Sequence, residues 1–357
     1  MAEKQLMQGN VAVAKGAIDA GCRYYFGYPI TPQNDIPEYL SAALPAVGGV
    51  FVQAESELAS INMVLGASAA GGLAMTSSSG PGISLMQEGL SYLAGSELPA
   101  VVVNITRSGP GLGGIAPTQG DYNQATKGGG HGDYRLIVLA PNSVQEMYDL
   151  AGEAFRLSYS YRNPAMILAD AILGQMKEPV QLSIPVDPPG EGSWVLSGAK
   201  NRKPRLVKSL FLKDGEMTVH NLKLKEKYDQ LKAKEVKVEV DCPPNCSLVL
   251  VSFGSCSRIV RTAVDRARKR GYPVGLVRPI TLYPFPEAAV REAAENADRV
   301  LVVEMNTGQM VDDVKLACGN PGNVSFKGYP GGSVPTPEEI EAEIYGILEG
   351  GLQACQQ

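Results

Sequence analysis

Several residue types that build common active sites are scarce or badly spaced in this sequence of 357 residues. The only histidines, His131 and His220, nearly exclude a two-histidine metal site and leave few candidates for a Ser-His-Asp triad. The six cysteines form no Cys-x-x-Cys pair, so the usual zinc and iron–sulfur frameworks are absent. The sequence also has no Gly-x-x-x-x-Gly-Lys-Ser/Thr loop for nucleotide phosphates. We therefore expect no metal ligands in this chain.

Cys242 and Cys246 come nearest to a cysteine pair, with two prolines and an asparagine between them. Two thiols are too few for a closed four-ligand metal site. We interpret both residues as buried or incidental reduced thiols.

Long apolar runs and a strong charge of either sign are also missing. No stretch approaches 18 apolar residues, and the first residues lack the apolar core of a signal peptide, so we predict a cytoplasmic protein without membrane contact. Hydrophobic residues at 44% and charged residues at 19% are typical of a soluble globular chain. The formal net charge of −5 argues against a nucleic-acid partner.

Short apolar runs alternate with helical patterns along most of the chain. Strands are expected at 22–26, 49–53, 74–77, 101–105, 136–139 and 165–168, and again at 247–253, 274–277 and 300–303. Helices between the strands imply right-handed βαβ units and parallel sheets, so the predicted fold class is α/β. The length allows two domains, which we place at residues 1–184 and 245–357.

The segment between these domains, residues 185–244, differs in composition. Pro185, Pro188 and Pro189 indicate a linker, and residues 200–237 hold 12 Lys or Arg against 5 Asp or Glu. Residues 221–234 are expected to form a surface helix with one apolar stripe. Such a charge run is usually a solvated face. The functional alternative is a docking surface for an acidic partner or for phosphate groups.

The loop Gly-Tyr-Pro-Ile-Thr-Pro, residues 27–32, directly follows the first expected strand. Each proline fixes its own φ and favours an extended conformation in the residue before it, so Tyr28 and Thr31 should be extended. In an open α/β sheet such a loop lies at the carboxyl ends of the strands, where ligands bind. The structural alternative is that Thr31 caps a helix whose first turn holds Pro32.

Two charged residues are expected near the same edge of the sheet. Glu57 falls in the first turn of a helix of small, apolar residues, where a pocket would be dry; alternatively, Glu55 and Glu57 only complement the helix dipole. Arg107 follows the apolar strand 101–105 and precedes a glycine-rich loop, residues 109–114. A guanidinium can bind a carboxylate through two parallel hydrogen bonds, although a surface ion pair is the simpler explanation.

Taken together, these stretches resemble one family. Tyr28-Pro-Ile-Thr-Pro32 is similar to the signature loop in the α subunits of 2-oxoacid:ferredoxin oxidoreductases, thiamine-diphosphate enzymes that oxidise 2-oxoacids to acyl-CoA. The resemblance covers most of the chain and continues through residues 53–57, 79–82, 98–114 and 278–286. The last of these segments, with residues 304–310, is most like the branched-chain 2-oxoacid type.

The resemblance implies a fold and a set of site residues. It implies a thiamine-diphosphate pyrimidine-type domain, followed by one similar to the carboxy-terminal domain of transketolase-like enzymes. It assigns to Glu57 the hydrogen bond to the aminopyrimidine ring, which favours the imino tautomer of the cofactor. It assigns the 2-oxoacid carboxylate to Arg107 and Thr31, and it places Tyr28 and Pro29 beside the cofactor.

The resemblance also implies partner subunits. Enzymes of this kind normally hold magnesium and the diphosphate through a Gly-Asp-Gly motif, whereas this chain has Gly-Asp-Tyr at residues 120–122 and 132–134. It also lacks cysteines spaced for an iron–sulfur cluster. We therefore expect a β subunit with the diphosphate and magnesium site, γ and ferredoxin-like subunits with the clusters, ferredoxin as electron acceptor, and coenzyme A as a substrate.

Three alternative functions stay open. A 2-oxoglutarate enzyme would need a second cation for the distal carboxylate, and the nearby candidates are Lys127, His131 and Arg135. Apolar residues near the motifs favour an apolar substrate instead: Ile30, Leu112 and Ile115. A thiamine enzyme of the transketolase or decarboxylase kind would need no electron carrier, but the missing magnesium motif argues against it. The third alternative is a non-catalytic assembly subunit of the same fold.

Overall fold

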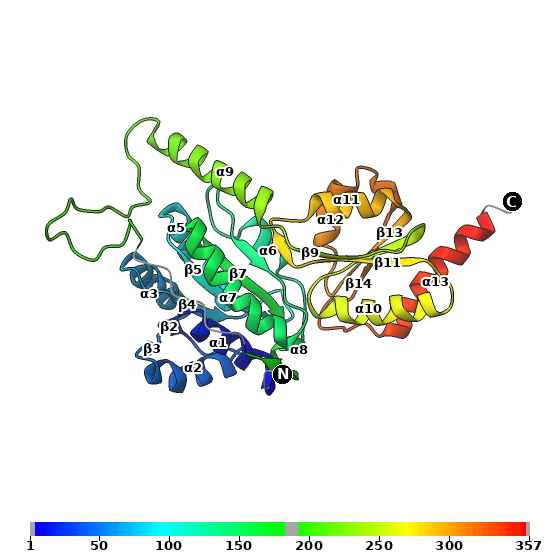
Figure 1. Ribbon diagram of the computed structural model, residues 1–357, viewed down its shortest axis with the longest axis horizontal. Helices are drawn as coiled ribbons and strands as arrows, with labels where there is room; N and C mark the ends of the chain where they lie inside the picture. Colours follow the sequence, from blue (N-terminus) through cyan, green and yellow to red (C-terminus); the bar gives the residue numbers. More distant parts are fainter. Residues whose placement is uncertain (1–3, 183–191, 355–357) are drawn as a thin grey trace.

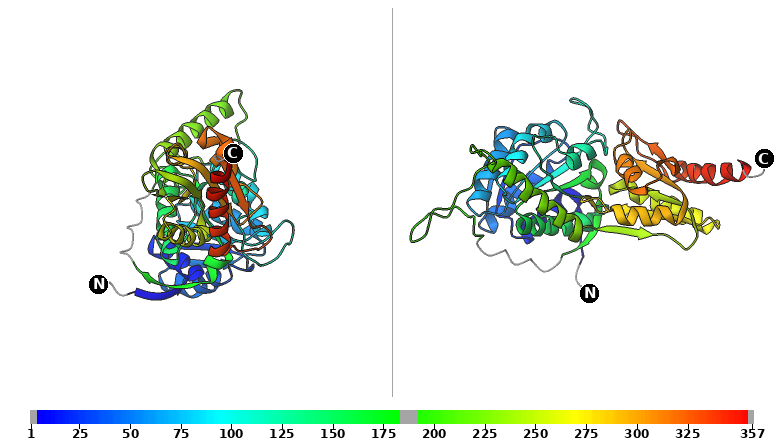
Figure 2. Two further views of the ribbon diagram at one scale, coloured as in Figure 1. Left: turned by 90° about the vertical axis from the view of Figure 1, so that its right-hand side faces the viewer. Right: turned by 90° about the horizontal axis from the view of Figure 1, so that it is seen from above.

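The computed structural model describes residues 4–182 and 192–354. The chain forms two α/β units that lie side by side along the long axis of the molecule (Figure 1). A view from above shows helix α13, Pro337–Ala354, extending from the far end of the second unit (Figure 2). Pro185, Pro188 and Pro189, the prolines of the predicted linker, lie outside the described residues. Within the described residues no helix is both long and apolar enough to cross a bilayer.

The first unit is built on a seven-stranded sheet in the order β12-β6-β7-β5-β4-β2-β3. Every residue of the central strand β5, Ala100–Thr106, is buried, as expected for a parallel strand covered on both faces. All neighbouring strands are parallel except β12 and β6. The other strands are β2 Tyr24–Gly27, β3 Val50–Gln53, β4 Ala74–Ser78, β6 Ile137–Leu139, β7 Pro164–Asp170 and β12 Thr281–Tyr283.

Helices cover both faces of this sheet. The chain steps outward from β2 to β3 and then back to β4, so right-handed connections place α2, Asp35–Ala46, and α3, Glu57–Ala69, on opposite faces. Helix α2 packs on α1, which packs on α7, whereas α3 packs on α4 and α5. The bounds are α1 Gly9–Asp19, α4 Pro81–Leu85, α5 Gln87–Gly95, α6 Tyr122–Lys127, α7 Val144–Tyr161 and α8 Ala171–Gln175; strands β1 Lys4–Gln8 and β8 Lys177–Gln181 form a separate antiparallel pair.

The second unit has a five-stranded sheet in the order β14-β13-β10-β11-β9, parallel except for β9. Its elements are β9 Val238–Asp241, β10 Cys246–Val251, α10 Gly254–Lys269, β11 Val274–Pro279, α11 Glu287–Glu295, β13 Ala297–Glu304, α12 Met310–Cys318, a 3₁₀ turn at Pro321–Asn323 and β14 Val324–Gly328. The predicted fold class, two parallel-sheet α/β units, is confirmed.

One strand of the first sheet comes from late in the chain. Residues 281–283 form β12, which pairs with β6 although it lies within the predicted second domain. Just before it, the buried Arg278 donates two hydrogen bonds to Glu146 of α7 and one to Glu239 of β9 (2.8–2.9 Å). Charge-assisted bidentate pairs of this kind are strong, so Arg278 ties the two units together.

The basic segment contains the predicted surface helix. Helix α9, Glu216–Lys234, buries one apolar stripe formed by Leu224, Tyr228 and Leu231. The described loop before α9, residues 192–215, projects from the first unit (Figure 1). The docking role of the basic segment stays a prediction.

Candidate active site

Contacts from three directions hold the proline loop, residues 27–32, at the carboxyl end of β2. The carbonyl oxygen of Pro32 accepts hydrogen bonds from Asn10 Nδ2 of α1 (2.9 Å) and Gln175 Nε2 of α8 (3.0 Å). The carbonyl oxygen of Thr31 accepts one from Arg107 Nη1 (3.0 Å). Helix α2 begins only at Asp35 without a side-chain cap, so the structural alternative in which Thr31 caps it is wrong. The loop is fixed by tertiary contacts instead.

Arg107 lies directly after β5 and is only 9% exposed. Besides its bond to Thr31, its Nη2 donates to the carbonyl oxygen of Leu112 in the glycine-rich loop (3.3 Å). Its Nε is buried without a partner, and across residues 4–182 and 192–354 no carboxylate pairs with it. The surface ion pair considered above is therefore not formed by any described residue. A buried guanidinium without an anion is well suited to bind a carboxylate ligand.

Glu57 is the first residue of α3 and is 5% exposed, whereas Glu55 is exposed. The side chain of Ser56 caps the helix, which fixes the position of the next residue. In the described part of the chain, Glu57 Oε1 accepts one long hydrogen bond, from Ser78 Oγ at the end of β4 (3.5 Å). The carboxylate thus keeps most of its hydrogen-bonding capacity for another group.

The turn between β4 and α4 lies between these two charged residues. A Cβ atom on Gly82 would lie 2.4 Å from Glu57 Oε1, and one on Gly80 would lie 3.5 Å from Arg107 Nε. Gly80 has a φ of +45°, a backbone conformation that residues other than glycine rarely adopt. The hydroxyl of Ser79, between them, is buried without a partner. The turn therefore brings the backbone close to both candidate residues.

A cavity of about 590 Å³ opens beside Arg107 at the junction of the two units. Its lining comes from the β4–α4 turn, the glycine-rich loop, residues 118–121, residues 306–309 and residues 330–331. Thr31 lines a neighbouring cavity of about 390 Å³, together with Ile115 and Gln175. The structure thus brings Thr31 and Arg107 together, and Glu57 lies behind the turn that lines the larger cavity.

Tyr28 and Pro29 face away from the protein interior. Tyr28 is 38% exposed, Pro29 is also exposed, and the carbonyl oxygen of Tyr28 accepts from Gln33 Nε2 (3.2 Å). Their predicted place beside a cofactor stays a prediction, because this edge of the site is open to solvent in the single chain.

The sequence reasoning assigned no site role to the residues that join the two units at this cavity. The Gln119 N–H donates to the Met305 carbonyl oxygen, and the Met305 N–H donates to Gln119 Oε1 (2.9 Å each). Asn306 Nδ2 donates to the Gln119 carbonyl oxygen (2.9 Å). The buried carboxylate of Glu304 accepts from the first N–H groups of α12, and burial raises its pKa. The signal available in the sequence was a polar run directly after an apolar strand, the same signal that marked Arg107.

Asp121 is a further acidic group in this cavity. Its side chain accepts a hydrogen bond from Asn104 Nδ2 (2.9 Å). Asn104 is the amide residue within the otherwise apolar middle of β5. Burial raises the pKa of Asp121 despite this hydrogen bond.

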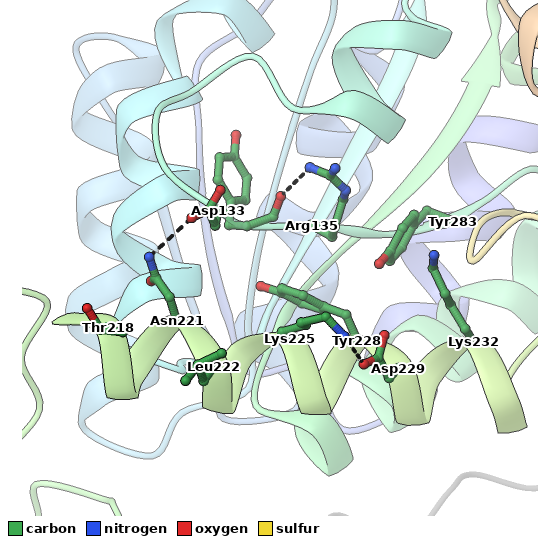
Figure 3. A pocket seen from close by; sticks show the side chains of 11 residues that line it. Asp133, Arg135, Thr218, Asn221, Leu222, Lys225, Tyr228, Asp229, Lys232 and Tyr283 are labelled. Atoms are coloured by element: carbon green, nitrogen blue, oxygen red, sulfur yellow. Dashed lines mark hydrogen bonds and ion pairs between the residues drawn. The ribbon is translucent and has the colours of Figure 1, made fainter. Parts of the chain in front are cut away.

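A separate cavity of about 550 Å³ lies between α9 and residues 133–135 (Figure 3). Arg135 lines it and donates to the carbonyl oxygens of Lys127 and Tyr134 (3.4 and 3.0 Å). Lys127 itself pairs with Asp313, and the exposed His131 packs edge-on against Tyr92. None of the three cations considered for a distal carboxylate lines the cavity beside Arg107.

The fold and the site define the class of protein. Residues 15–239 match the family described as "Pyruvate flavodoxin/ferredoxin oxidoreductase, thiamine diP-bdg", and residues 246–340 match "Pyruvate:ferredoxin oxidoreductase core domain II". The chain belongs to the 2-oxoacid:ferredoxin oxidoreductase family, as an α-type subunit. The predicted family and enzyme class are confirmed.

Individual relatives fit this assignment. The chain is 54% identical to ketoisovalerate oxidoreductase subunit VorB of Methanothermobacter marburgensis, over 88% of this chain and 90% of the relative. It is 40% identical to 2-oxoglutarate synthase subunit KorA of Archaeoglobus fulgidus, over 97% and 100%.

Solved structures also share the fold. The 2-oxoglutarate:ferredoxin oxidoreductase of Magnetococcus marinus, solved with 2-oxoglutarate, coenzyme A and succinyl-CoA bound, matches with a TM-score of 0.88 at 28% identity. The match covers 96% of this chain but only 65% of that one. A split-gene transketolase, at 11% identity and a TM-score of 0.57, shows likeness of fold alone.

Proposed function

We propose that this chain holds the 2-oxoacid carboxylate and the aminopyrimidine of thiamine diphosphate in a hetero-oligomeric enzyme. That enzyme oxidatively decarboxylates a branched-chain 2-oxoacid to acyl-CoA and passes two electrons to ferredoxin. The observation that carries the proposal is the environment of Arg107, a buried guanidinium that bonds two carbonyl oxygens and no described carboxylate. A 2-oxoacid carboxylate supplies the missing anion.

The residues at the β4–α4 turn fit the pyrimidine side of thiamine diphosphate, which supplies carbanion chemistry when it is bound. Glu57 would accept the hydrogen bond of a ring nitrogen, because its carboxylate is buried and only weakly bonded by Ser78. Gly82 has no side chain, so the backbone of the turn packs directly against that carboxylate and helps to hold it in place. Tyr28 and Pro29, on the open edge, would border the same ring.

Exposed apolar side chains around the site support a partner subunit that closes it. Leu112 is 81% exposed, and Leu58, Leu85 and Ile115 are also exposed. Clustered exposed apolar residues of this kind often mark protein interfaces. We assign the diphosphate and magnesium site to a β subunit on this face, and the iron–sulfur clusters to γ and ferredoxin-like subunits. The cytoplasmic location stays part of this proposal.

Three observations favour a branched-chain substrate over 2-oxoglutarate. The three candidate cations for a distal carboxylate do not line the cavity beside Arg107, and the apolar Ile115 lines the neighbouring cavity together with Thr31. The relative with 54% identity is named for ketoisovalerate. In favour of 2-oxoglutarate stands the likeness to the Magnetococcus marinus structure. It is the second candidate.

The test is co-purification with the neighbouring subunits, followed by an assay with coenzyme A and an artificial electron acceptor. We expect a higher kcat/KM for ketoisovalerate than for 2-oxoglutarate, and the reverse order would overturn the substrate assignment. The Arg107→Ala complex should need far more oxoacid for half-maximal rate. Arg266→Ala is a matched control, because Arg266 is an exposed arginine in the second unit that already pairs with two carboxylates, Glu338 and Glu341. Equal KM values for both variants would remove Arg107 from the substrate site.

A further inference from the structure

The two cysteines that looked incidental in the sequence meet in the second unit. Cys242 directly follows β9 and Cys246 begins β10, and these two strands lie on opposite sides of β11. The short connection between the cysteines, residues 243–245, therefore crosses the end of β11. Asn245 turns the chain there with a φ of +58°, in the left-handed region.

Both sulfur atoms lie against Gly275 in the middle strand, which has no side chain to separate them. A Cβ atom on Gly275 of β11 would lie 2.6 Å from Cys242 Sγ and 3.0 Å from Cys246 Sγ. Both sulfur atoms thus border one point, so they are at most about 6 Å apart. The absence of a side chain at Gly275 makes the encounter possible.

The environment distinguishes the two thiols chemically. The hydrogen bond from Cys242 and the nearby Arg268 guanidinium lower the pKa of the buried Cys246, against the effect of burial. The same hydrogen bond raises the pKa of the half-buried Cys242. By contrast, burial raises the pKa of Cys22, Cys256 and Cys318. A thiol with a lowered pKa beside a second thiol is the usual arrangement of a reactive and a resolving cysteine.

We propose that Cys242 and Cys246 form a reversible dithiol–disulfide site that reacts with hydrogen peroxide. The Cys246 thiolate attacks one peroxide oxygen, the O–O bond breaks, and a sulfenic acid and hydroxide form. The Cys242 sulfur then attacks the Cys246 sulfur, its proton goes to the departing hydroxyl as water, and the disulfide forms. The hydroxide takes up the proton that the Cys246 thiol released on ionisation. In total, two thiols are oxidised by two electrons and one peroxide is reduced to two waters. A dithiol reductant reverses the change.

The site is independent of the substrate proposed above. The bond would join the end of β9 to the start of β10. It would therefore fix the point at which the chain passes from the basic segment into the second sheet. It would also hold the two strands that flank β11 at a fixed separation.

The test uses the full chain, treated with peroxide, then unfolded in denaturant, blocked with a maleimide and digested with trypsin. Residues 238–258 contain no internal lysine or arginine, so Cys242, Cys246 and Cys256 are released on one peptide. We expect maleimide labelling of this peptide to fall from three sites to one, with loss of two hydrogen atoms and recovery after reduction. Fragmentation should place the bond between Cys242 and Cys246.

Three variants test the geometry. Cys242→Ser should stop at a sulfenic acid on Cys246 that dimedone traps, and Cys318→Ser should react like the wild type. Gly275→Ala keeps both thiols but puts a methyl group against both sulfurs, so disulfide formation should slow by about tenfold or more. A wild-type peptide that keeps all three thiols, or a bond that uses Cys256, would overturn the proposal. So would a Gly275→Ala variant that is folded by circular dichroism and reacts at the wild-type rate.

Discussion

Replacing Glu57 with glutamine should separate activity from stability more clearly than any other change at the site. The carboxylate is 5% exposed and accepts one hydrogen bond of 3.5 Å within the described chain. Burying a charge with so few partners costs free energy, so its removal should leave the melting temperature unchanged or slightly higher. Glutamine has nearly the same shape, which matters because Gly82 leaves no room for a larger group.

The expected effect on turnover follows from the hydrogen bond that glutamate would make to the aminopyrimidine. A hydrogen bond to a charged group contributes about 1.5–3 kcal/mol. If the transition state feels the whole loss, kcat should fall by roughly 10- to 150-fold. An effect of this size with an unaltered melting temperature would identify Glu57 as a functional rather than a structural residue.

The assay measures kcat of the assembled complex with an artificial electron acceptor at saturating thiamine diphosphate, together with a thermal melt. Glu55→Gln is the matched control, because Glu55 lies two residues earlier and is exposed. We expect wild-type turnover for that control. A fully assembled Glu57→Gln complex with wild-type kcat would refute the catalytic assignment and favour a non-catalytic assembly subunit.

The remaining predictions concern the substrate, the cofactor and acid stability. Arg107→Ala should raise KM for the oxoacid by roughly 10- to 150-fold with thiamine diphosphate still bound, measured by steady-state kinetics and cofactor titration. Gly82→Ala should weaken cofactor binding in the same titration, whereas Gly346→Ala, in open space on α13, should leave it unchanged. Burial alone would raise the pKa of Glu97, but its lysine partners in α9 lower it below 4.5. The ionised Glu97 therefore stabilises the folded state above pH 4.5, and this stabilisation is lost as the pH falls through the lowered pKa. In thermal melts, the difference in melting temperature between the wild type and Glu97→Gln should shrink below pH 4.5.

Most of the fold followed from local patterns in the sequence. The apolar run at 101–105 predicted a strand buried on both faces, and β5 is buried throughout. The capping pattern at Thr31 and Pro32 predicts a helix that begins at Pro32, but α2 begins at Asp35. Side chains of Asn10 and Gln175, from distant parts of the chain, hold the Pro32 carbonyl oxygen instead. Strand β12 has only three residues, too few to show a period, so its pairing was not predictable.

Part of the candidate site was likewise predictable from the sequence, and part was not. That Thr31 and Arg107 would meet followed from the rule that parallel strands end at one edge of a sheet. The other wall of the cavity, including Asn306 and Gln309, depends on how the two units pack. That packing rests on hydrogen bonds between Gln119 and Met305, residues 186 positions apart, and no local pattern encodes it.

The late strand β12 affects how this protein can be divided. A fragment that stopped near residue 240 would lose the partner of β6 and leave its outer N–H and C=O groups free to pair with another chain. Such a fragment should aggregate or pair with itself rather than fold as an independent module. Chimeras between relatives should therefore place their junction after residue 283, although the sequence changes character forty residues earlier.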